Sequence, residues 1–309
     1  MTTVPYHPGA PASGPVPSPE SSPESSPESS TAEQHAAPVD DSMNSVLGKA
    51  RLILEAFDTE NAELSLTDLV RRTGVAKASV YRLAQELTAW GVLERNGTRY
   101  HLGLRLFELG QLVPRQRILR QAALPFMEDL LMATQETVHF AVREGLDVLY
   151  IEKIIGHRGL REQSRVAGRL PLHSTATGKV ILAYSPTALF DEVVKEGFTA
   201  HTRHTTMSVA LLRKQVDRVR LEGISVEREE VRLGYLSTAV PVFGGRGMLA
   251  GALSITGPTT RLHVDRVAGA LRTAAAGISR AVQAMSCDGG TDDADCRAAL
   301  CPLPHCRHR

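Results

Sequence analysis

Apolar residues recur at helical spacing from about residue 45 onward, and they predict three consecutive helices. In the first helix they lie three and four positions apart between Val46 and Phe57. A second, short helix begins near Leu66 and is followed by Gly74. The third is expected from about Lys77 to Ala89, and its apolar stripe falls at i, i+3, i+4 and i+7: Val80, Leu83, Ala84 and Leu87.

Two short strands are predicted directly after the third helix. Gly91 is suited to ending that helix, and the segment VLERNGTRYHL then places short strand patterns on either side of Asn96-Gly97. This dipeptide is typical of a type I′ hairpin turn, in which both central residues have positive φ. Helix, tight glycine turn, helix and hairpin in this order predict a winged helix-turn-helix domain over residues 43–102.

The outer face of the third helix is small, hydroxylic and basic, which suits the entry of its first turn into a major groove about 12 Å wide. Arg82 and Gln85 are the expected readers of guanine and adenine edges. Two arginines flank the hairpin turn and are expected to contact backbone phosphate or an adjacent minor groove. The candidate DNA-contacting residues are Arg71, Arg72, Lys77, Ala78, Ser79, Tyr81, Arg82, Gln85, Arg95 and Arg99.

Charge along the chain supports this interpretation. Residues 71–105 hold seven basic and two acidic side chains, a net of +5, whereas residues 43–70 hold two basic and five acidic ones, a net of −3. The whole chain carries only +1, so affinity for DNA has to come from this local concentration. Two alternatives stay open: the face is an ordinary solvated helix surface, or it binds another protein.

An apolar helical segment from Leu102 to Val113 follows the hairpin, and Pro114 limits or kinks it. We expect a linker helix over residues 103–116. It either pairs two protomers, because two half-sites of DNA need two readers, or packs only within its own chain.

A second domain is predicted over residues 117–285. A helix at 118–133 precedes strand patterns at 137–142, 147–154, 224–230, 235–243 and 248–257, and a closing helix spans about 264–284. A short extended piece at 169–171 enters a helix near Ser174 or Thr175, and Leu211, Leu212, Val216 and Val219 mark another helix. Successive strands close in sequence with helices at the edges favour a largely antiparallel α+β fold.

Sequence motifs for catalysis, metal binding or cofactor binding are weak in this domain. We therefore predict no catalytic residues, no metal site and no cofactor. The segment Thr177–Lys179 lacks the flanking glycine and hydroxyl residue of a phosphate-binding loop, since His173 and Val180 occupy those positions. The HTRH segment (His201–His204) has no obvious third metal ligand. Hydroxyl-bearing strand positions instead suggest a pocket that faces the start of the helix near Ser174, where free amide groups favour a carboxylate.

The two ends of the chain differ from the rest. Residues 1–42 hold nine of the 17 prolines and a repeated Ser-Ser-Pro-Glu unit, which predicts a disordered arm. Residues 286–309 contain all four cysteines and are expected to form a flexible tail, so no disulfide framework is predicted for the folded part. The absence of an export signal or a spanning apolar run favours a cytoplasmic protein without a membrane partner.

Several stretches together resemble the isocitrate-lyase-regulator (IclR) family of bacterial transcription regulators. They are SVLGKARLILEAF, LSLTDLVRRTGVAKASVYRLAQELTAWGVLER, RYHLGLRLFELG, ETVHFAV, RLPLHSTATGKVILA, EREEVRLGYLSTAVPV and ALSITGP, which cover about residues 45–284 in order. The resemblance implies an N-terminal winged helix-turn-helix and a C-terminal effector-binding domain similar to the GAF fold. It also implies homodimers, often homotetramers, whose affinity for a double-stranded operator is modulated by a small organic acid.

The resemblance also implies the residues of the effector pocket. Ala176 and Thr177 fall where the backbone at a helix start binds the acid, and Glu227 falls at the acidic position of the pocket. Ser237 stands where many relatives have cysteine. A carboxylate beside a bound acid favours a hydroxy acid, a keto-acid hydrate or a phenolic acid, because two carboxylates repel unless one is protonated. The full set is Leu170, Ala176, Thr177, Glu227, Ser237, Ser254 and Thr256.

The sequence therefore predicts a ligand-responsive transcriptional regulator, with repression as the expected sign and activation as the alternative. A less favoured hypothesis makes the second domain an enzyme for small acids, with His173, Ser174 or Glu227 as catalytic residues.

Overall fold

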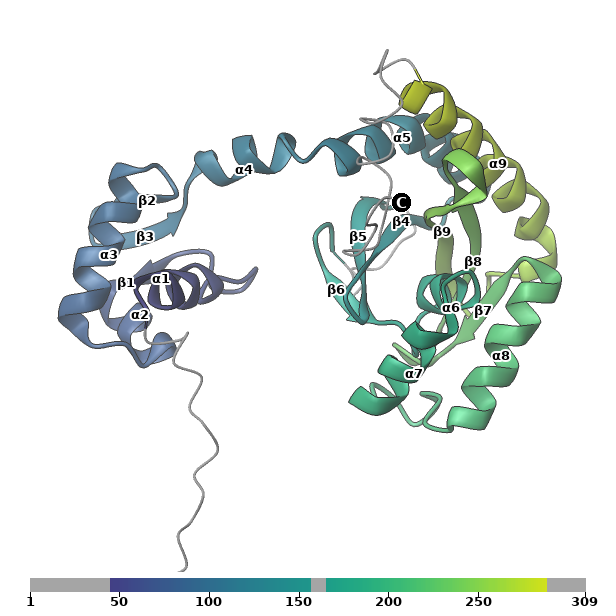
Figure 1. The fold of residues 1–309 in the computed structure, drawn as a ribbon, viewed down its shortest axis with the longest axis horizontal. Helices are drawn as coiled ribbons and strands as arrows, with labels where there is room; N and C mark the ends of the chain where they lie inside the picture. The colour runs from purple at the N-terminus through teal and green to yellow at the C-terminus, as the bar shows by residue number, and fades with distance from the viewer. Residues whose placement is uncertain (1–44, 157–164, 288–309) are drawn as a thin grey trace, which may run out of the picture. The chain divides into compact units, whose positions relative to one another are not determined.

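The computed structural model describes residues 45–156 and 165–287 (Figure 1). Contacts between Cα atoms divide the chain into one unit that ends at Ala84 and a second that begins at Gln85, a division that falls inside a helix. The predicted arm at residues 1–42 lies outside the described residues, as do Cys296, Cys301 and Cys306 of the predicted tail.

The first unit contains the helices expected from the apolar spacing: α1 (Val46–Glu55) and α2 (Leu66–Thr73), with the two-residue strand β1 (Leu64–Ser65) between them. Ser65 and Asp68 form a capping box at the start of α2, in which each side chain bonds the other residue's backbone N–H. Gly74 ends α2 with φ at 68°, a left-handed conformation that costs glycine little. The capping pair and the glycine explain why α2 is short.

Helix α3 (Lys77–Ala89) has the predicted bounds. The four residues of its predicted apolar stripe, Val80, Leu83, Ala84 and Leu87, are all buried. The predicted buried face of α3 is therefore confirmed. The opposite face of the helix does not contribute to this core.

Strands β2 (Leu93–Asn96) and β3 (Arg99–Leu102) form an antiparallel hairpin, as predicted. The turn between them differs from the predicted turn. Asn96 pairs with Arg99, so the two turn residues are Gly97 and Thr98, and of these only Gly97 has positive φ. The prediction of a type I′ turn centred on Asn96-Gly97 was wrong. Glycine at the first central position alone supplies the positive φ, which is the pattern of a type II′ turn.

The predicted linker helix over residues 103–116 is divided in two. Helix α4 (Leu104–Gln111) ends before Pro114, and α5 (Pro114–Thr134) starts at that proline. Proline at the first helical position lacks only an N–H that the helix would not use, so it starts a helix more readily than it continues one. The helix expected at 118–133 therefore begins four residues earlier.

The second unit is built around a six-stranded sheet with strand order β6-β5-β4-β9-β8-β7, in which every neighbouring pair is antiparallel. The α+β prediction for this part is confirmed. The strands are β4 (Thr137–Glu144), β5 (Asp147–Ile154), β6 (Arg169–Pro171), β7 (Ser225–Arg228), β8 (Tyr235–Phe243) and β9 (Leu249–Pro258).

Two helical layers cover the two faces of the sheet (Figure 1). Helices α5 and α9 (Val264–Cys287) pack on one face, where the core includes Phe140, Leu253 and Ile278. On the other face lie α6 (Ala176–Ala183), α7 (Thr187–Glu196) and α8 (Val209–Glu222). Helix α7 was not predicted. Helix α8 contains Leu211, Leu212, Val216 and Val219, the four residues that predicted a helix here; the last three are buried and Leu211 is 47% exposed.

Helix α6 is the centre of the second layer, and all eight of its residues are buried. It packs against a sheet face that carries alanines at Ala141, Ala239 and Ala252, whose small side chains allow a close approach. Gly178 allows a second close approach, because a Cβ there would lie 2.2 Å from the carbonyl oxygen of Leu172. These contacts fix where the first turn of α6 lies.

Candidate functional site

The exposed face of α3 carries the predicted DNA readers. Ala78, Arg82 and Gln85 are four and three positions apart, so they lie on one face of the helix, and all three are exposed. Lys77 is also exposed and Ser79 is half-buried, while Tyr81 keeps 50% of its surface accessible. The helix therefore presents donors, an amide and an aromatic ring opposite its buried stripe.

Arg71 and Arg72 are both exposed, and each has an acidic partner in its own unit. The guanidinium of Arg71 lies 2.8 Å from a carboxylate oxygen of Asp68, and that of Arg72 lies 2.6 Å from one of Asp58. Hydrogen bonds from Asn61, followed by those from Glu60 and Arg72, lower the pKa of Asp58 to about 2. Arg72 thus joins α2 to the segment that contains Asp58, and its role in DNA contact stays a prediction.

The hairpin arginines differ in how they are held. Arg95 donates to the carbonyl of Gly97 at 2.8 Å, and its guanidinium lies 5.7 Å from the ring centroid of Tyr100. These contacts hold the Arg95 side chain against its own hairpin. Arg99, at the other side of the turn, is exposed.

A cavity of about 50 Å³ opens in the second unit, and all seven predicted effector residues line it. This volume is several times the roughly 10–15 Å³ that one water molecule needs. Six further residues complete the lining: His139, Tyr150, Thr175, Val231, Arg232 and Tyr235.

The position of the cavity follows from a change of residue type along one face of the sheet. On the central strands, the face that packs against α6 carries alanines, and farther along the same strands it carries His139, Ser254 and Ser237. The register places His139 opposite Ser254, and Ser237 opposite Thr256. At one end of this sheet face, small apolar residues pack against α6. At the other end, polar residues line the cavity.

The start of α6 supplies one wall of the cavity. The side chain of Thr175 caps the helix and accepts a hydrogen bond from the N–H of Gly178 at 2.9 Å. Helix geometry leaves the N–H groups of Ala176 and Thr177 without an acceptor in the helix. With the helix dipole they form a site that favours an anionic oxygen.

Two hydroxyl groups of the lining are buried without a hydrogen-bond partner among the described residues: Thr177 Oγ1 and the Tyr235 hydroxyl. Buried polar atoms in folded proteins nearly always have a partner, which can be a ligand or an ordered water. Ser237 and Thr256, by contrast, bond each other at 3.0 Å. The cavity therefore offers two unused hydrogen-bonding groups as well as the free amides of α6.

Glu227 also lines the cavity and is 3% exposed. Its Oε1 accepts hydrogen bonds from the backbone N–H groups of Glu230 and Val231, at 2.5 and 3.2 Å. Burial outweighs these bonds and raises the pKa of Glu227 to about 7. At neutral pH a substantial fraction of this side chain carries a proton and is able to donate a hydrogen bond into the cavity.

The other histidines singled out in the sequence have structural partners. His173 is buried, stacks on Phe198 at 4.8 Å between ring centroids, and contacts the carbonyl of Thr199 through Nε2 at 3.1 Å. Burial is the main cause that lowers its pKa. His204 lies 3.5 Å from Glu229. Within the described ranges, His, Cys, Asp and Glu side chains form no group of three or more able to hold a metal ion.

We predict that Glu227→Gln reduces the pH dependence of stability. Burial holds the proton on Glu227 to a higher pH in the folded chain than in the unfolded one, so its stabilising contribution is complete below pH 4.5 and is lost as the pH rises toward 7. Gln keeps the acceptor oxygen and removes the charge. Urea unfolding at pH 5 and pH 8 should show the variant gaining roughly 2–3 kcal/mol relative to the parent at the higher pH.

The matched control is Glu192→Gln on the exposed side of α7, for which the difference from the parent should be the same at both pH values. An equal effect of the two substitutions would contradict the assignment of the raised pKa to Glu227.

Family comparisons match both parts of the chain. The family described as "Bacterial transcriptional regulator IclR C-terminal" matches residues 111–280, and the "IclR helix-turn-helix domain" matches residues 46–97. The first match alone spans more than half of the chain.

Characterised relatives agree with these matches over most of their length. The HTH-type transcriptional regulator KdgR of Dickeya chrysanthemi is 37% identical over 245 residues, which cover 77% of this chain and 80% of the relative. The glycerol operon regulatory protein of Streptomyces griseus is 32% identical over 241 residues, covering 76% and 94%.

Solved structures show the same fold. An IclR homologue from Microbacterium hydrocarbonoxydans, complexed with 4-hydroxybenzoate, aligns with a TM-score of 0.72 at 29% identity, covering 78% of this chain and all of that one. The IclR protein of Thermotoga maritima aligns with a TM-score of 0.66 at 28% identity, covering 78% and 99%. A reader helix in a helix-turn-helix unit, a sheet domain with a polar cavity and these matches lead to one conclusion: the chain belongs to the IclR family of bacterial transcriptional regulators.

Proposed function

We propose that this regulator represses a metabolic operon and that a small organic acid, bound in the cavity beneath α6, changes its affinity for the operator. The observation that carries the proposal is that the first turn of α6 lines the cavity beside two buried hydroxyls, of Thr177 and Tyr235, that have no hydrogen-bond partner in the described part of the chain. Helix geometry leaves the N–H groups of Ala176 and Thr177 in this turn without an acceptor in the helix. The acid can act only by binding the DNA-competent and incompetent arrangements of the protein unequally.

The lining favours an acid with a second oxygen function. Its carboxylate is suited to the start of α6, while the protonated fraction of Glu227 and the hydroxyls of Ser254 and Tyr235 are suited to hydroxyl or carbonyl oxygens. A hydroxy acid or a keto acid satisfies these groups. A phenolic acid is the second candidate, supported by the 4-hydroxybenzoate complex of the related Microbacterium protein.

An enzyme for small acids is less well supported. Ser174 Oγ has no hydrogen-bond partner within the described residues, and His173 contacts the carbonyl of Thr199. Glu227 is bonded by the backbone N–H groups of Glu230 and Val231 and by the side chain of Ser237, whose other partner is the hydroxyl of Thr256 and not a second base. A nucleophile needs an adjacent base oriented by a third group. We therefore infer a binding domain that does not turn over its ligand.

The chain's place of action follows from the proposed role. Regulation of an operon requires access to chromosomal DNA, which places the protein in the bacterial cytoplasm. None of the helices in the described part of the chain has the length and apolar character needed to cross a membrane.

We also propose a homodimer that pairs through α4, because recognition of two half-sites requires two readers. None of the residues of α4 is buried, and Leu104 and Phe107 are 64% and 63% exposed. Exposed apolar groups at adjacent positions of a helix typically mark an interface.

Sedimentation velocity should show a dimer, or a tetramer built from dimers, for the parent and a smaller species for Leu104→Ser/Phe107→Ser. Leu221→Ser, at an 88% exposed site on α8, is the control, and a monomeric parent would contradict the proposal.

For DNA binding we predict that Arg82→Ala weakens operator affinity by roughly 10- to 100-fold, the typical cost of losing a base-reading arginine. A mobility-shift assay with the DNA upstream of the protein's own gene measures this. Lys195→Ala, on α7, removes an exposed positive charge elsewhere and should leave affinity unchanged. Equal effects of the two substitutions would mean that α3 does not read the operator.

The same mobility-shift assay tests whether a small acid changes operator binding. Glycerate, pyruvate, D-gluconate and 4-hydroxybenzoate represent the acid classes, and at least one should release the parent protein from its operator at millimolar concentration. If none of them changes the bound fraction, these acid classes are not the effector.

A further inference from the structure

We propose that Lys179 is a positioning residue for the effector cavity: its buried ammonium group holds Glu230, and through Glu230 it fixes the turn that forms the acidic wall. This inference rests on the proposed function, because it assigns a role within the same binding site.

The burial of Lys179 is costly and calls for an explanation. The side chain is fully buried in α6, among residues such as Val180, Ile181 and Leu182, and it forms an ion pair with Glu230, which is also buried. Burying an ion costs several kcal/mol even when it is paired, and apolar residues of similar size are often as stable or more so. Stability alone therefore does not explain this pair.

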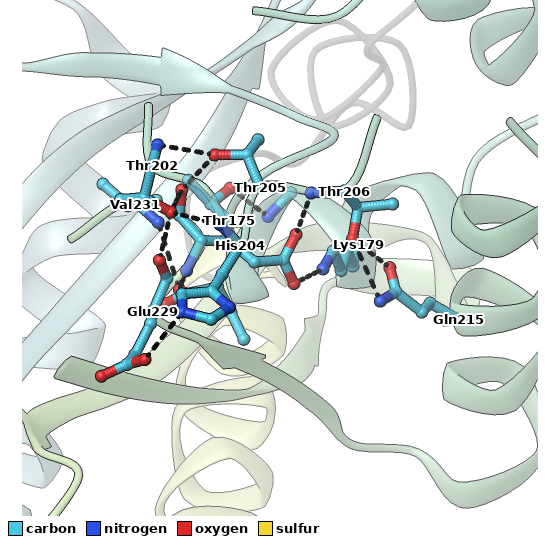
Figure 2. A network of polar contacts seen from close by, with 12 residues as sticks. Thr175, Lys179, Thr202, His204, Thr205, Thr206, Gln215, Glu229 and Val231 are labelled. Atoms are coloured by element: carbon cyan, nitrogen blue, oxygen red, sulfur yellow. Dashed lines mark hydrogen bonds and ion pairs between the residues drawn. The ribbon is translucent and has the colours of Figure 1, made fainter. Parts of the chain in front are cut away.

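The ion pair is the centre of a polar network around the turn after β7 (Figure 2). One carboxylate oxygen of Glu230 faces Lys179, and the other accepts from the N–H of Thr206 at 3.1 Å. The carbonyl of Glu230 accepts from the hydroxyl of Thr205 at 2.6 Å, and that of Glu229 accepts from Thr202 at 2.6 Å. The backbone of residues 229–230 is thus held from two sides, by α6 and by the loop at 202–206.

The same turn contains a strained residue. Glu229 has φ at 60°, in the left-handed region that residues other than glycine, asparagine and aspartate rarely adopt. Such strain persists only where surrounding contacts hold it, and it is frequent at ligand-binding sites. The Lys179–Glu230 pair and the threonine hydroxyls supply those contacts.

The turn leads directly to the cavity. The N–H groups of Glu230 and Val231 bind the carboxyl group of Glu227, and Val231 and Arg232 line the cavity themselves. Lys179 lies two and three positions after Thr177 and Ala176 in the same rigid helix. Helix α6 therefore contributes its first turn to the cavity lining and, through Lys179, fastens the turn that contributes Val231 and Arg232, so that one helix holds both parts of the lining.

Hydrogen exchange of the full-length protein tests this proposal without a ligand. In Lys179→Met/Glu230→Leu, both charges are replaced by apolar groups, so the urea midpoint should be close to that of the parent. Amides in residues 227–235 should nevertheless exchange at least tenfold faster, while those of β9 keep their protection, because the turn has lost its fastening. Unchanged exchange in residues 227–235 would overturn the proposal.

A matched control replaces another ion pair of the same domain. Arg120 and Glu152 are joined at 3.0 Å between α5 and β5, and neither lines the cavity. Arg120→Met/Glu152→Leu should leave exchange in residues 227–235 at the parental rate. If this control also accelerates it, the effect is a general loosening of the domain and the positioning role is refuted.

A second pair of variants decides the question if the buried substitutions prevent folding. Thr205→Val removes the hydroxyl that binds the Glu230 carbonyl, and Thr205→Ser keeps it. Exchange in residues 227–235 should rise in the valine variant and be restored in the serine variant. Identical rates in the two would overturn the role assigned to the network.

Calorimetry with D-gluconate and 4-hydroxybenzoate adds the binding readout, and the apolar double variant should bind the recognised acid at least tenfold more weakly than the parent. Equal affinity would overturn the positioning role. If the parent binds neither acid, the proposed ligand class fails, and the exchange measurements still decide the role of Lys179.

Discussion

The close approach of α6 to the sheet is the contact on which the rest of the effector domain depends. A helix with all eight residues buried needs small neighbours, and the alanines of the sheet together with Gly178 provide them. Because the helix lies this close, its first turn faces the polar end of the same sheet surface. The cavity forms where alanines give way to His139, Ser254 and Thr256. Packing at one end of the face thus creates a binding site at the other.

This arrangement also explains why charged groups are found so deep in the domain. Glu227 and the Lys179–Glu230 pair would be unfavourable in an ordinary core, yet they border or support a cavity. The raised pKa of Glu227 leaves a proton available at neutral pH, which relieves the repulsion that a bound carboxylate would otherwise meet. Under the proposed function, the cost of burying these groups is therefore tied to recognition of an acid.

Elements with strong local signals could be predicted from the sequence, and those set by distant contacts could not. The spacing of Val80, Leu83 and Leu87 correctly predicted the extent of α3 and which of its faces is buried. The hairpin turn was assigned to the wrong type. A type II′ turn needs positive φ at only one central residue, here Gly97, and the residue types alone do not distinguish it from a type I′ turn. The pairing of Arg72 with Asp58 joins residues 14 positions apart, and only the fold brings them together.

The cavity shows the same limit. The seven residues inferred from family resemblance all line it, whereas Arg232 and Tyr235 were missed. His139 lies opposite Ser254 only because β4 pairs with β9, strands more than 100 positions apart in the chain. The alternation that places His139 on the same face as Ala141 is visible in the sequence, but the partner strand is not.

The proposed sensing mechanism requires that the first turn of α6 bind the carboxylate of the effector. Nuclear magnetic resonance of the labelled protein, titrated with the acid that releases the operator, monitors these amides individually. We expect saturable downfield shifts of the Ala176 and Thr177 amide protons, since each would gain a charged acceptor. An acid that releases the operator and leaves both amides unmoved would contradict it.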